Sequence, residues 1–240
     1  MTTLVPSGPS IAVITFPGSN GDEDAVYAFK ERLGLPTRLV DYREESLDGF
    51  SAVVLPGGFS YGDYLRSGAI ARFAPVMTTL KDFADRGGPV LGICNGFQVL
   101  AEAHLLPGAL LRNATLRFHC HWTHIKIEQT GTAWTNALTK GEVLRLPVAH
   151  GDGSYFADPD TLARLERTGR VVARYVTADG DVSDEANANG SVNAIAAIAN
   201  DAGNVVGLMP HPERASDPLV GGEDGLRMLR SVLSYLNVAV

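Results

Sequence analysis

The sequence has few cysteines, no excess of basic residues and no long apolar run. Its 240 residues include two cysteines, Cys94 and Cys120, which argues against a disulfide framework and favours a reducing compartment, the cytoplasm. The formal net charge of -7 argues against a nucleic-acid partner or an anionic membrane surface. No apolar run could span a membrane, and the opening MTTLVPSGPS lacks the basic and apolar segments of a secretory signal.

Sequence repeats, low-complexity tracts and clear interdomain linkers are also missing, so we expect a single domain over residues 1–240. The glycine-rich stretch Pro56-Gly57-Gly58 has neither the spacing of a phosphate-binding loop nor that of a dinucleotide fingerprint. We therefore expect no nucleotide, metal or other cofactor on this chain.

The first hundred residues alternate between strand and helix patterns, as in a parallel sheet. Apolar runs predict strands at 11–16, 37–40, 52–55 and 89–93, and helical spacing predicts helices at 22–33, 70–84 and 97–103. This alternation predicts an α/β fold with three layers, in which a mostly parallel, doubly wound sheet is flanked by helices.

The remaining chain is less regular. Residues 115–128 alternate loosely and predict a small additional strand or hairpin arm. The other expected elements are strands at 143–148, 171–177, 192–198 and 205–209, a helix at 161–167, and a final helix with Leu226, Leu229, Leu233 and Leu236 on one face.

Cys94 lies between a predicted buried strand and a predicted helix, with Gly92 and Gly96 two positions to either side. Small neighbours allow the sharp, strained turn that exposes a nucleophile, and a helix N-terminus favours a thiolate. A buried structural cysteine is the alternative, and Cys94 alone does not decide between them.

His211 and Glu213 follow the last predicted strand in the motif Pro210-His211-Pro212-Glu213. If that strand runs parallel beside the strand before Cys94, the imidazole lies level with the thiol and can act as its base, with Glu213 orienting it. Such a pair is by itself more often a solvated surface turn. Together with an elbow cysteine, the catalytic interpretation is favoured.

An acyl-transfer site also needs backbone N–H donors for an oxyanion. The amide of Asn95, at the start of its helix, is one candidate. The Gly57-Gly58-Phe59 stretch provides a second, because glycines let the main chain approach a ligand closely.

A cluster of histidines in residues 118–124 invites a metal interpretation. On a strand, His119 and His121 share one face, whereas Cys120 and His124 fall on the other. Zinc needs three or four convergent ligands, so we disfavour a metal site there.

With these residues placed, the sequence closely resembles the class I (triad) glutamine amidotransferases. Within them it is most similar to the glutaminase subunits of phosphoribosylformylglycinamidine synthase, the PurQ type. The resemblance covers nearly the whole chain, through FPGSNGDEDA, LPGGFSYGDYLRSGAIA, GICNGFQVL, LLRNATLRFHCHW, AHGDGSYF, NGSVNAIAAI and GNVVGLMPHPERASDPLVGGEDG. One departure is the 118–124 arm, where His119 and His121 stand in place of a more basic pattern.

The resemblance implies a role for each matching residue. Cys94 would be the nucleophile, His211 the base and Glu213 its orienting partner. Donors at Gly58, Phe59 and Asn95 would form the oxyanion hole, while Gly57, Gln98 and His150 would bind the substrate glutamine.

The resemblance also implies partners. Ammonia would pass to a synthetase subunit that holds ATP and magnesium and converts formylglycinamide ribonucleotide to formylglycinamidine ribonucleotide. A small bridging subunit would join the same complex. We further expect that Cys94 is poorly aligned, or its oxyanion loop turned away, until the synthetase binds.

Three other functions stay open at this stage. One is a glutaminase that serves a different ammonia acceptor, and another is a cysteine hydrolase of related fold. The third is a regulatory module without activity, which the intact Cys94, His211 and Glu213 argue against.

Overall fold

The computed structural model describes residues 8–237. Within this range, the main sheet has nine strands in the order β2-β1-β3-β4-β11-β10-β9-β6-β7. Their bounds are β1 Ile11–Thr15, β2 Thr37–Asp41, β3 Ala52–Leu55, β4 Val90–Ile93, β6 His119–Ile127, β7 Val143–His150, β9 Val171–Val176, β10 Ile195–Ala199 and β11 Val205–Leu208. A separate antiparallel pair joins β5 (Ala109–Leu111) to β8 (Ser154–Phe156).

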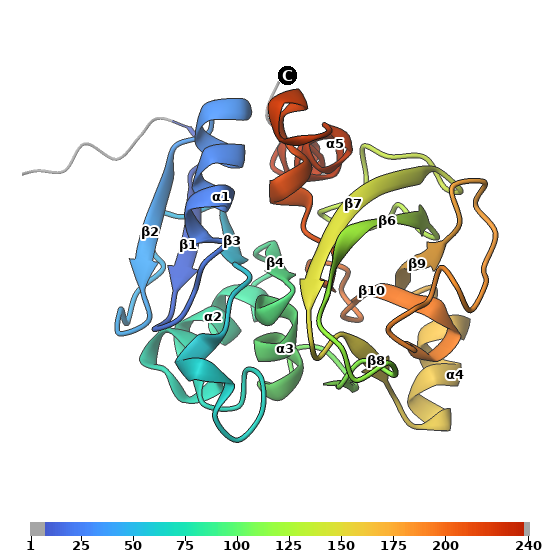
Figure 1. The fold of residues 1–240 in the computed structure, drawn as a ribbon. Helices are drawn as coiled ribbons and strands as arrows, with labels where there is room; N and C mark the ends of the chain where they lie inside the picture. The colour runs from blue at the N-terminus through green and yellow to red at the C-terminus, as the bar shows by residue number, and fades with distance from the viewer. Residues whose placement is uncertain (1–7, 238–240) are drawn as a thin grey trace, which may run out of the picture.

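The main sheet has a parallel half and an antiparallel half (Figure 1). Strands β2, β1, β3, β4 and β11 pair in parallel. The side chains of all but the edge strand β2 are largely buried, because helices cover both faces. From β11 onward, β10, β9, β6 and β7 pair antiparallel. The predicted α/β fold, with a mostly parallel sheet flanked by helices, is confirmed. The expected additional arm is β6, whose long pairing with β7 forms one edge of the main sheet.

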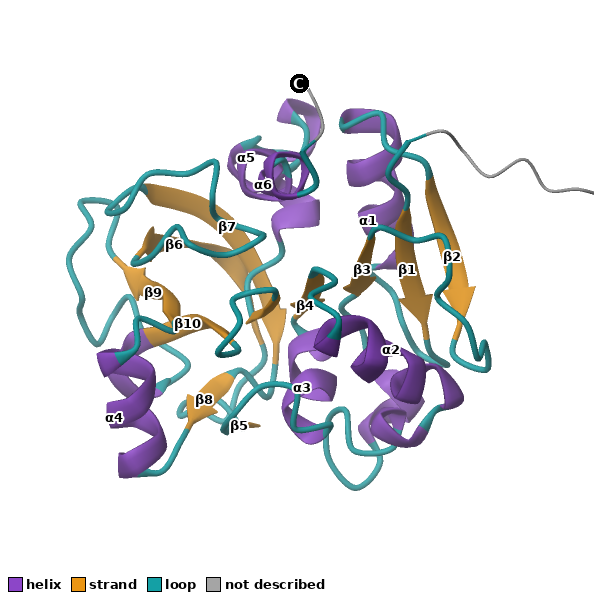
Figure 2. Ribbon diagram, turned by 180° about the vertical axis from the view of Figure 1, so that it is seen from behind, coloured by secondary structure: helices purple, strands orange, loops and turns teal. Residues whose placement is uncertain are grey.

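Helices α1, α2 and α3 flank the parallel half, whereas α4 lies beside β9 and β10 of the antiparallel half (Figures 1 and 2). The crossover from β1 to β2 and the crossover from β3 to β4 run in opposite directions across the sheet. Because both are right-handed, α1 covers one face of the sheet, and α2 and α3 cover the other. The bounds are α1 Asp22–Val26, α2 Pro75–Asp85, α3 Asn95–Glu102, α4 Pro159–Arg167, α5 Asp224–Leu229 and α6 Ser231–Tyr235. None of the described helices is long and apolar enough to cross a membrane.

Several predicted elements differ in detail. The helix expected at 22–33 changes after Val26 into a π-helical turn, Tyr27–Arg32. The strand expected at 192–198 begins only at Ile195, because Asn193 and Ala194 adopt positive φ angles of 51° and 54° that no strand accommodates. The single final helix is instead two short helices that meet at Arg230.

Candidate active site

Cys94 lies on the turn between β4 and α3, as predicted. Its backbone angles, φ 50° and ψ -104°, are rare for a residue with a side chain, so the turn is strained. The flanking glycines are required, since a Cβ on Gly96 would overlap the Leu55 carbonyl and one on Gly92 would lie 2.8 Å from the Gly96 backbone. The strand-to-helix elbow is therefore confirmed.

His211 lies at the same end of the sheet as Cys94 because β4 and β11 are parallel neighbours. Ile93 pairs with Leu208 at the ends of the two strands. The backbone N–H of Cys94 donates to the Leu208 carbonyl over 2.8 Å. The expected strand adjacency is confirmed, and it brings together residues that are far apart in the sequence.

Glu213 orients the imidazole of His211. The distance from His211 Nδ1 to Glu213 Oε1 is 2.6 Å, and the two residues are 1% and 2% exposed. Burial alone would lower the pKa of His211, but the charges of Glu213 and Cys94 raise it to about 10. The arrangement thus stabilises an imidazolium beside a thiolate, which is the charge state a cysteine nucleophile requires.

The thiol and the imidazole are neighbours, but they are not hydrogen-bonded in this arrangement. Cys94 Sγ lies 3.7 Å from the Ala149 carbonyl oxygen. Within residues 8–237, His211 Nε2 has no hydrogen-bond partner.

Gly57 lies directly against the side chains of His211 and Cys94. A Cβ at this position would be 2.6 Å from His211 Cε1 and 3.6 Å from Cys94 Cβ. The lack of room for a Cβ beside the imidazole therefore explains a glycine at position 57. The expected contact of Gly57 with substrate stays a prediction.

The three predicted oxyanion donors are not equivalent. The Phe59 N–H donates to the Gly18 carbonyl over 2.9 Å, so its use by an oxyanion would require that bond to break. The described residues offer no hydrogen-bond acceptor to the amides of Gly58 and Asn95. These two amides, on the turns after β3 and β4, are therefore the better placed donors, and their role stays a prediction.

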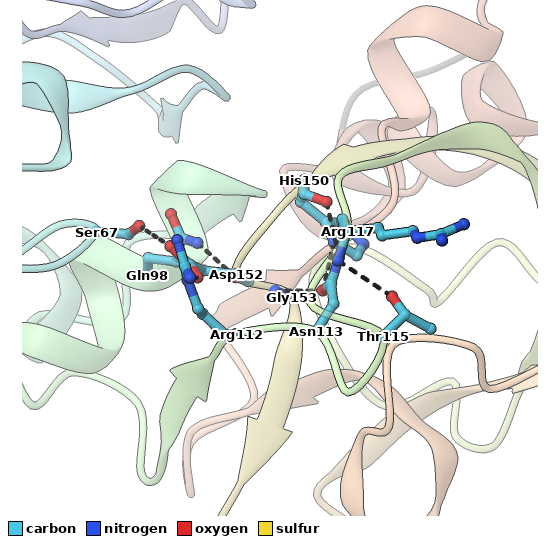
Figure 3. Close-up of polar contacts among 9 residues, drawn as sticks. All are labelled: Ser67, Gln98, Arg112, Asn113, Thr115, Arg117, His150, Asp152 and Gly153. Atoms are coloured by element: carbon cyan, nitrogen blue, oxygen red, sulfur yellow. Dashed lines mark hydrogen bonds and ion pairs between the residues drawn. The ribbon is translucent and has the colours of Figure 1, made fainter.

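Gln98 uses its side chain to join two loops near the elbow (Figure 3). Its Nε2 donates to the Asp152 carbonyl over 2.6 Å, and its Oε1 accepts from Asn95 Nδ2 over 2.8 Å. Ser67 Oγ donates to the Asp152 carboxylate over 3.1 Å. Gln98 thus fixes the loop after β7, and its predicted contact with glutamine is not tested by these bonds.

His150, at the end of β7, is held by Asn113, a residue that the sequence did not single out (Figure 3). Asn113 Nδ2 donates to the carbonyls of His150 and Arg117, and its Oδ1 accepts from the Gly153 N–H. Oδ1 is therefore an acceptor for His150 Nδ1 as well, at 3.1 Å. This assigns the proton of the neutral ring to Nδ1.

His150 is also kept neutral by its surroundings. Burial first, then the nearby imidazoles of His119 and His211, lower its pKa to about 3. The ring is 3% exposed. The sequence carried no signal for this arrangement beyond an asparagine in a polar loop.

A cavity of about 440 Å³ opens beside His211 and Glu213, which is a suitable volume for a small ligand. Ala149, Trp122 and Arg214 also line it. Of the predicted site residues, Cys94, Gly57, Gln98 and His150 do not line it. Residues 8–237 contain no group of three or more His, Cys, Asp or Glu placed to hold a metal ion.

Comparison with known proteins decides the family. The model of the CobB/CobQ-like glutamine amidotransferase domain matches residues 8–221. A phosphoribosylformylglycinamidine synthase subunit PurQ from Thermomicrobium roseum is 60% identical over 223 residues, covering 93% of this chain and 94% of the relative. The chain belongs to the PurQ family of glutamine amidotransferases.

Other PurQ relatives agree with this placement. The PurQ subunit of Salinibacter ruber is 54% identical over 226 residues, covering 94% of this chain and 96% of that protein. Among solved structures, a chain of PurLQS from Thermotoga maritima is 43% identical with a TM-score of 0.84, covering 95% of this chain and 99% of that chain. The nine-stranded sheet and the elbow are thus those of a PurQ-type glutaminase fold.

Proposed function

We propose that this chain is the glutaminase subunit of phosphoribosylformylglycinamidine synthase and works as one domain. The observation that carries the proposal is the buried arrangement of Cys94, His211 and Glu213 at the ends of two neighbouring parallel strands. Together with PurQ relatives that are at least 50% identical over most of their length, this geometry favours glutamine hydrolysis over an unrelated hydrolase.

In the proposed reaction, the Cys94 thiolate attacks the carboxamide carbon of L-glutamine, and backbone N–H groups stabilise the oxyanion. His211 donates its proton to the departing ammonia, and a γ-glutamyl thioester remains on Cys94. His211 then takes a proton from water, which attacks the thioester and releases glutamate. Glu213 stabilises the imidazolium in both steps without itself taking up the proton.

The ammonia is proposed to pass to a synthetase subunit, where ATP and magnesium drive the conversion of formylglycinamide ribonucleotide to formylglycinamidine ribonucleotide. A small bridging subunit would complete the complex. The Phe59 amide bonded to Gly18, and the Cys94 thiol turned to Ala149, support an enzyme that is slow without its partner. Both cysteines are free, which suits the reducing cytoplasm as the proposed compartment.

The test is ammonia release from glutamine by wild type and by Cys94→Ala, with and without the synthetase, ATP and formylglycinamide ribonucleotide. Cys120→Ala is the matched control, since Cys120 is the exposed second thiol. We expect Cys94→Ala to lose at least about a thousandfold in rate and Cys120→Ala to keep wild-type turnover.

The partner dependence separates the alternatives. A steep rise in activity with the synthetase and its substrates supports the proposal. Activity that needs Cys94 but ignores this synthetase would indicate a glutaminase for another acceptor. No hydrolysis of glutamine in any mixture would refute glutaminase function and return the choice to a cysteine hydrolase or an inactive module.

A further inference from the structure

Arg214, the residue after Glu213, lies between the candidate triad and helix α1. Its Nε donates to Asp24 Oδ2 over 2.9 Å and lies 3.8 Å from Glu213 Oε1. One of its terminal nitrogens lies 3.3 Å from Asn20 Oδ1. The Arg214 side chain is 29% exposed, and its guanidinium lies between Asp24 and the buried carboxylate of Glu213.

Glu213 needs such a cation because its side chain is fully buried. Its Oε1 bonds to His211, but within residues 8–237 its Oε2 has no hydrogen-bond partner. A buried carboxylate that lacks partners is costly, and a nearby positive charge offsets part of that cost. Arg214 supplies this charge 3.8 Å from Oε1, the oxygen that also contacts His211.

The first turn of α1 is packed against this carboxylate. A Cβ on Gly21, the residue before this helix, would lie 3.3 Å from Glu213 Oε1, so the start of the helix lies close to the carboxylate. Asp22, Glu23 and Asp24 all lie in that turn, and of these Asp24 bonds to Arg214. Helix α1 therefore holds the guanidinium at a fixed distance from Glu213.

We propose that Arg214 and Asp24 are positioning residues for the triad, which hold the Glu213 carboxylate against His211. This inference rests on the proposed function, in which the Glu213 carboxylate stabilises the His211 imidazolium. The competing interpretation is an ordinary ion pair that joins α1 to the following loop and contributes only to stability.

The two interpretations differ in their dependence on pH. If Arg214 holds the Glu213 carboxylate against His211, its loss weakens the imidazolium that faces Cys94, so the acidic limb of the activity profile moves to higher pH. A purely structural role would lower the rate by the same factor at every pH. Lysine keeps the charge, so it should keep the wild-type limb even if the rate falls.

The experiment compares wild type with Arg214→Met, Arg214→Lys and Asp24→Asn in the complex with the synthetase, over a range of pH. We expect Arg214→Met to lose roughly tenfold more of its rate at pH 6 than at pH 8. Asp24→Asn should shift in the same direction by less, and Asp22→Asn, a neutralised carboxylate in the same turn, should not shift.

A second readout does not depend on glutaminase activity. The rate at which iodoacetamide alkylates Cys94, in a Cys120→Ser background, reports the thiolate that the imidazolium stabilises. We expect Arg214→Met to slow alkylation most at acidic pH and Arg214→Lys to restore it. If the glutamine assay fails but this pattern holds, the proposed function is wrong and the positioning role stands.

Two results would overturn the inference. One is an Arg214→Met profile that matches wild type after scaling by a constant, in both assays. The other is an equal shift for Arg214→Met and Arg214→Lys, since that would show that the charge is not what matters.

Discussion

The two halves of the sheet position their residues differently: the parallel half positions Cys94 and His211, and the antiparallel half positions His150. Cys94 and His211 follow β4 and β11, which are parallel neighbours, so the backbone alone brings them to one level. His150 ends β7 and is fixed by Asn113, a side chain 37 residues earlier in the chain. Backbone placement leaves a pattern in the sequence, whereas placement by one distant side chain does not.

This difference explains which features the sequence predicts. Gly92 and Gly96 around Cys94 indicate the elbow, because only glycine permits the contacts between α3 and β3. The His-x-Glu motif after a buried strand predicts that the imidazole lies at the same end of the sheet as Cys94. In contrast, some contacts join segments that are distant in the sequence, and local sequence patterns do not predict them. Examples are the hydrogen bonds of Asn113, the bond from the Phe59 amide to Gly18 and the Arg214–Asp24 pair.

The largest effect is expected from Gly96→Ala in the parallel half. The added methyl group would overlap the Leu55 carbonyl, so α3 would have to move away from β3. We expect a loss of about 4 kcal/mol or more in the free energy of unfolding, measured by urea titration. Gly151→Ala is the control, since its Cβ would meet only Phe118 Cδ2, at 3.7 Å, and a comparable loss there would contradict the argument.

Glu213→Gln tests the base without changing the backbone that carries it. The amide keeps the volume of Glu213 but removes the charge that raises the pKa of His211. We expect the kcat of glutamine hydrolysis to fall by roughly a hundredfold to ten-thousandfold, because the imidazolium loses its stabilising anion. A variant with near-normal kcat would show that Glu213 is only structural.

His150→Gln tests the antiparallel half through pH. The pKa of His150 is lowered to about 3, so its folded form stays neutral while the unfolded chain takes up a proton below its usual pKa. The resulting stability is fully present above pH 6.5 and is lost as the pH falls toward 3, by roughly 1.4 kcal/mol per pH unit. Between pH 6.5 and 5, this is about 2 kcal/mol.

The measurement for His150 is urea unfolding of wild type and His150→Gln at several pH values in that window. Glutamine cannot titrate, so we expect the variant to show a flatter dependence. His211 is present in both proteins, so its contribution cancels when their slopes are compared. Identical slopes for the two proteins would mean that His150 is protonated in the native state.

The smallest effect concerns the two edges of the sheet, β2 and β7. Arg145 on β7 lies 4.2 Å from the centre of the Trp122 ring, and one of its guanidinium nitrogens lies 3.3 Å from the Gly221 carbonyl oxygen. Arg38 on β2 lies 5.0 Å from the Phe50 ring, and its nearest carboxylate, on Glu44, is 3.9 Å away.

Tryptophan is the better cation–π partner, so Arg145→Met should cost about 1 kcal/mol and Arg38→Met less than about half of that. Urea unfolding of both variants checks the order, and a larger loss for Arg38→Met would show that the parallel edge, rather than the antiparallel one, depends on its side-chain contacts.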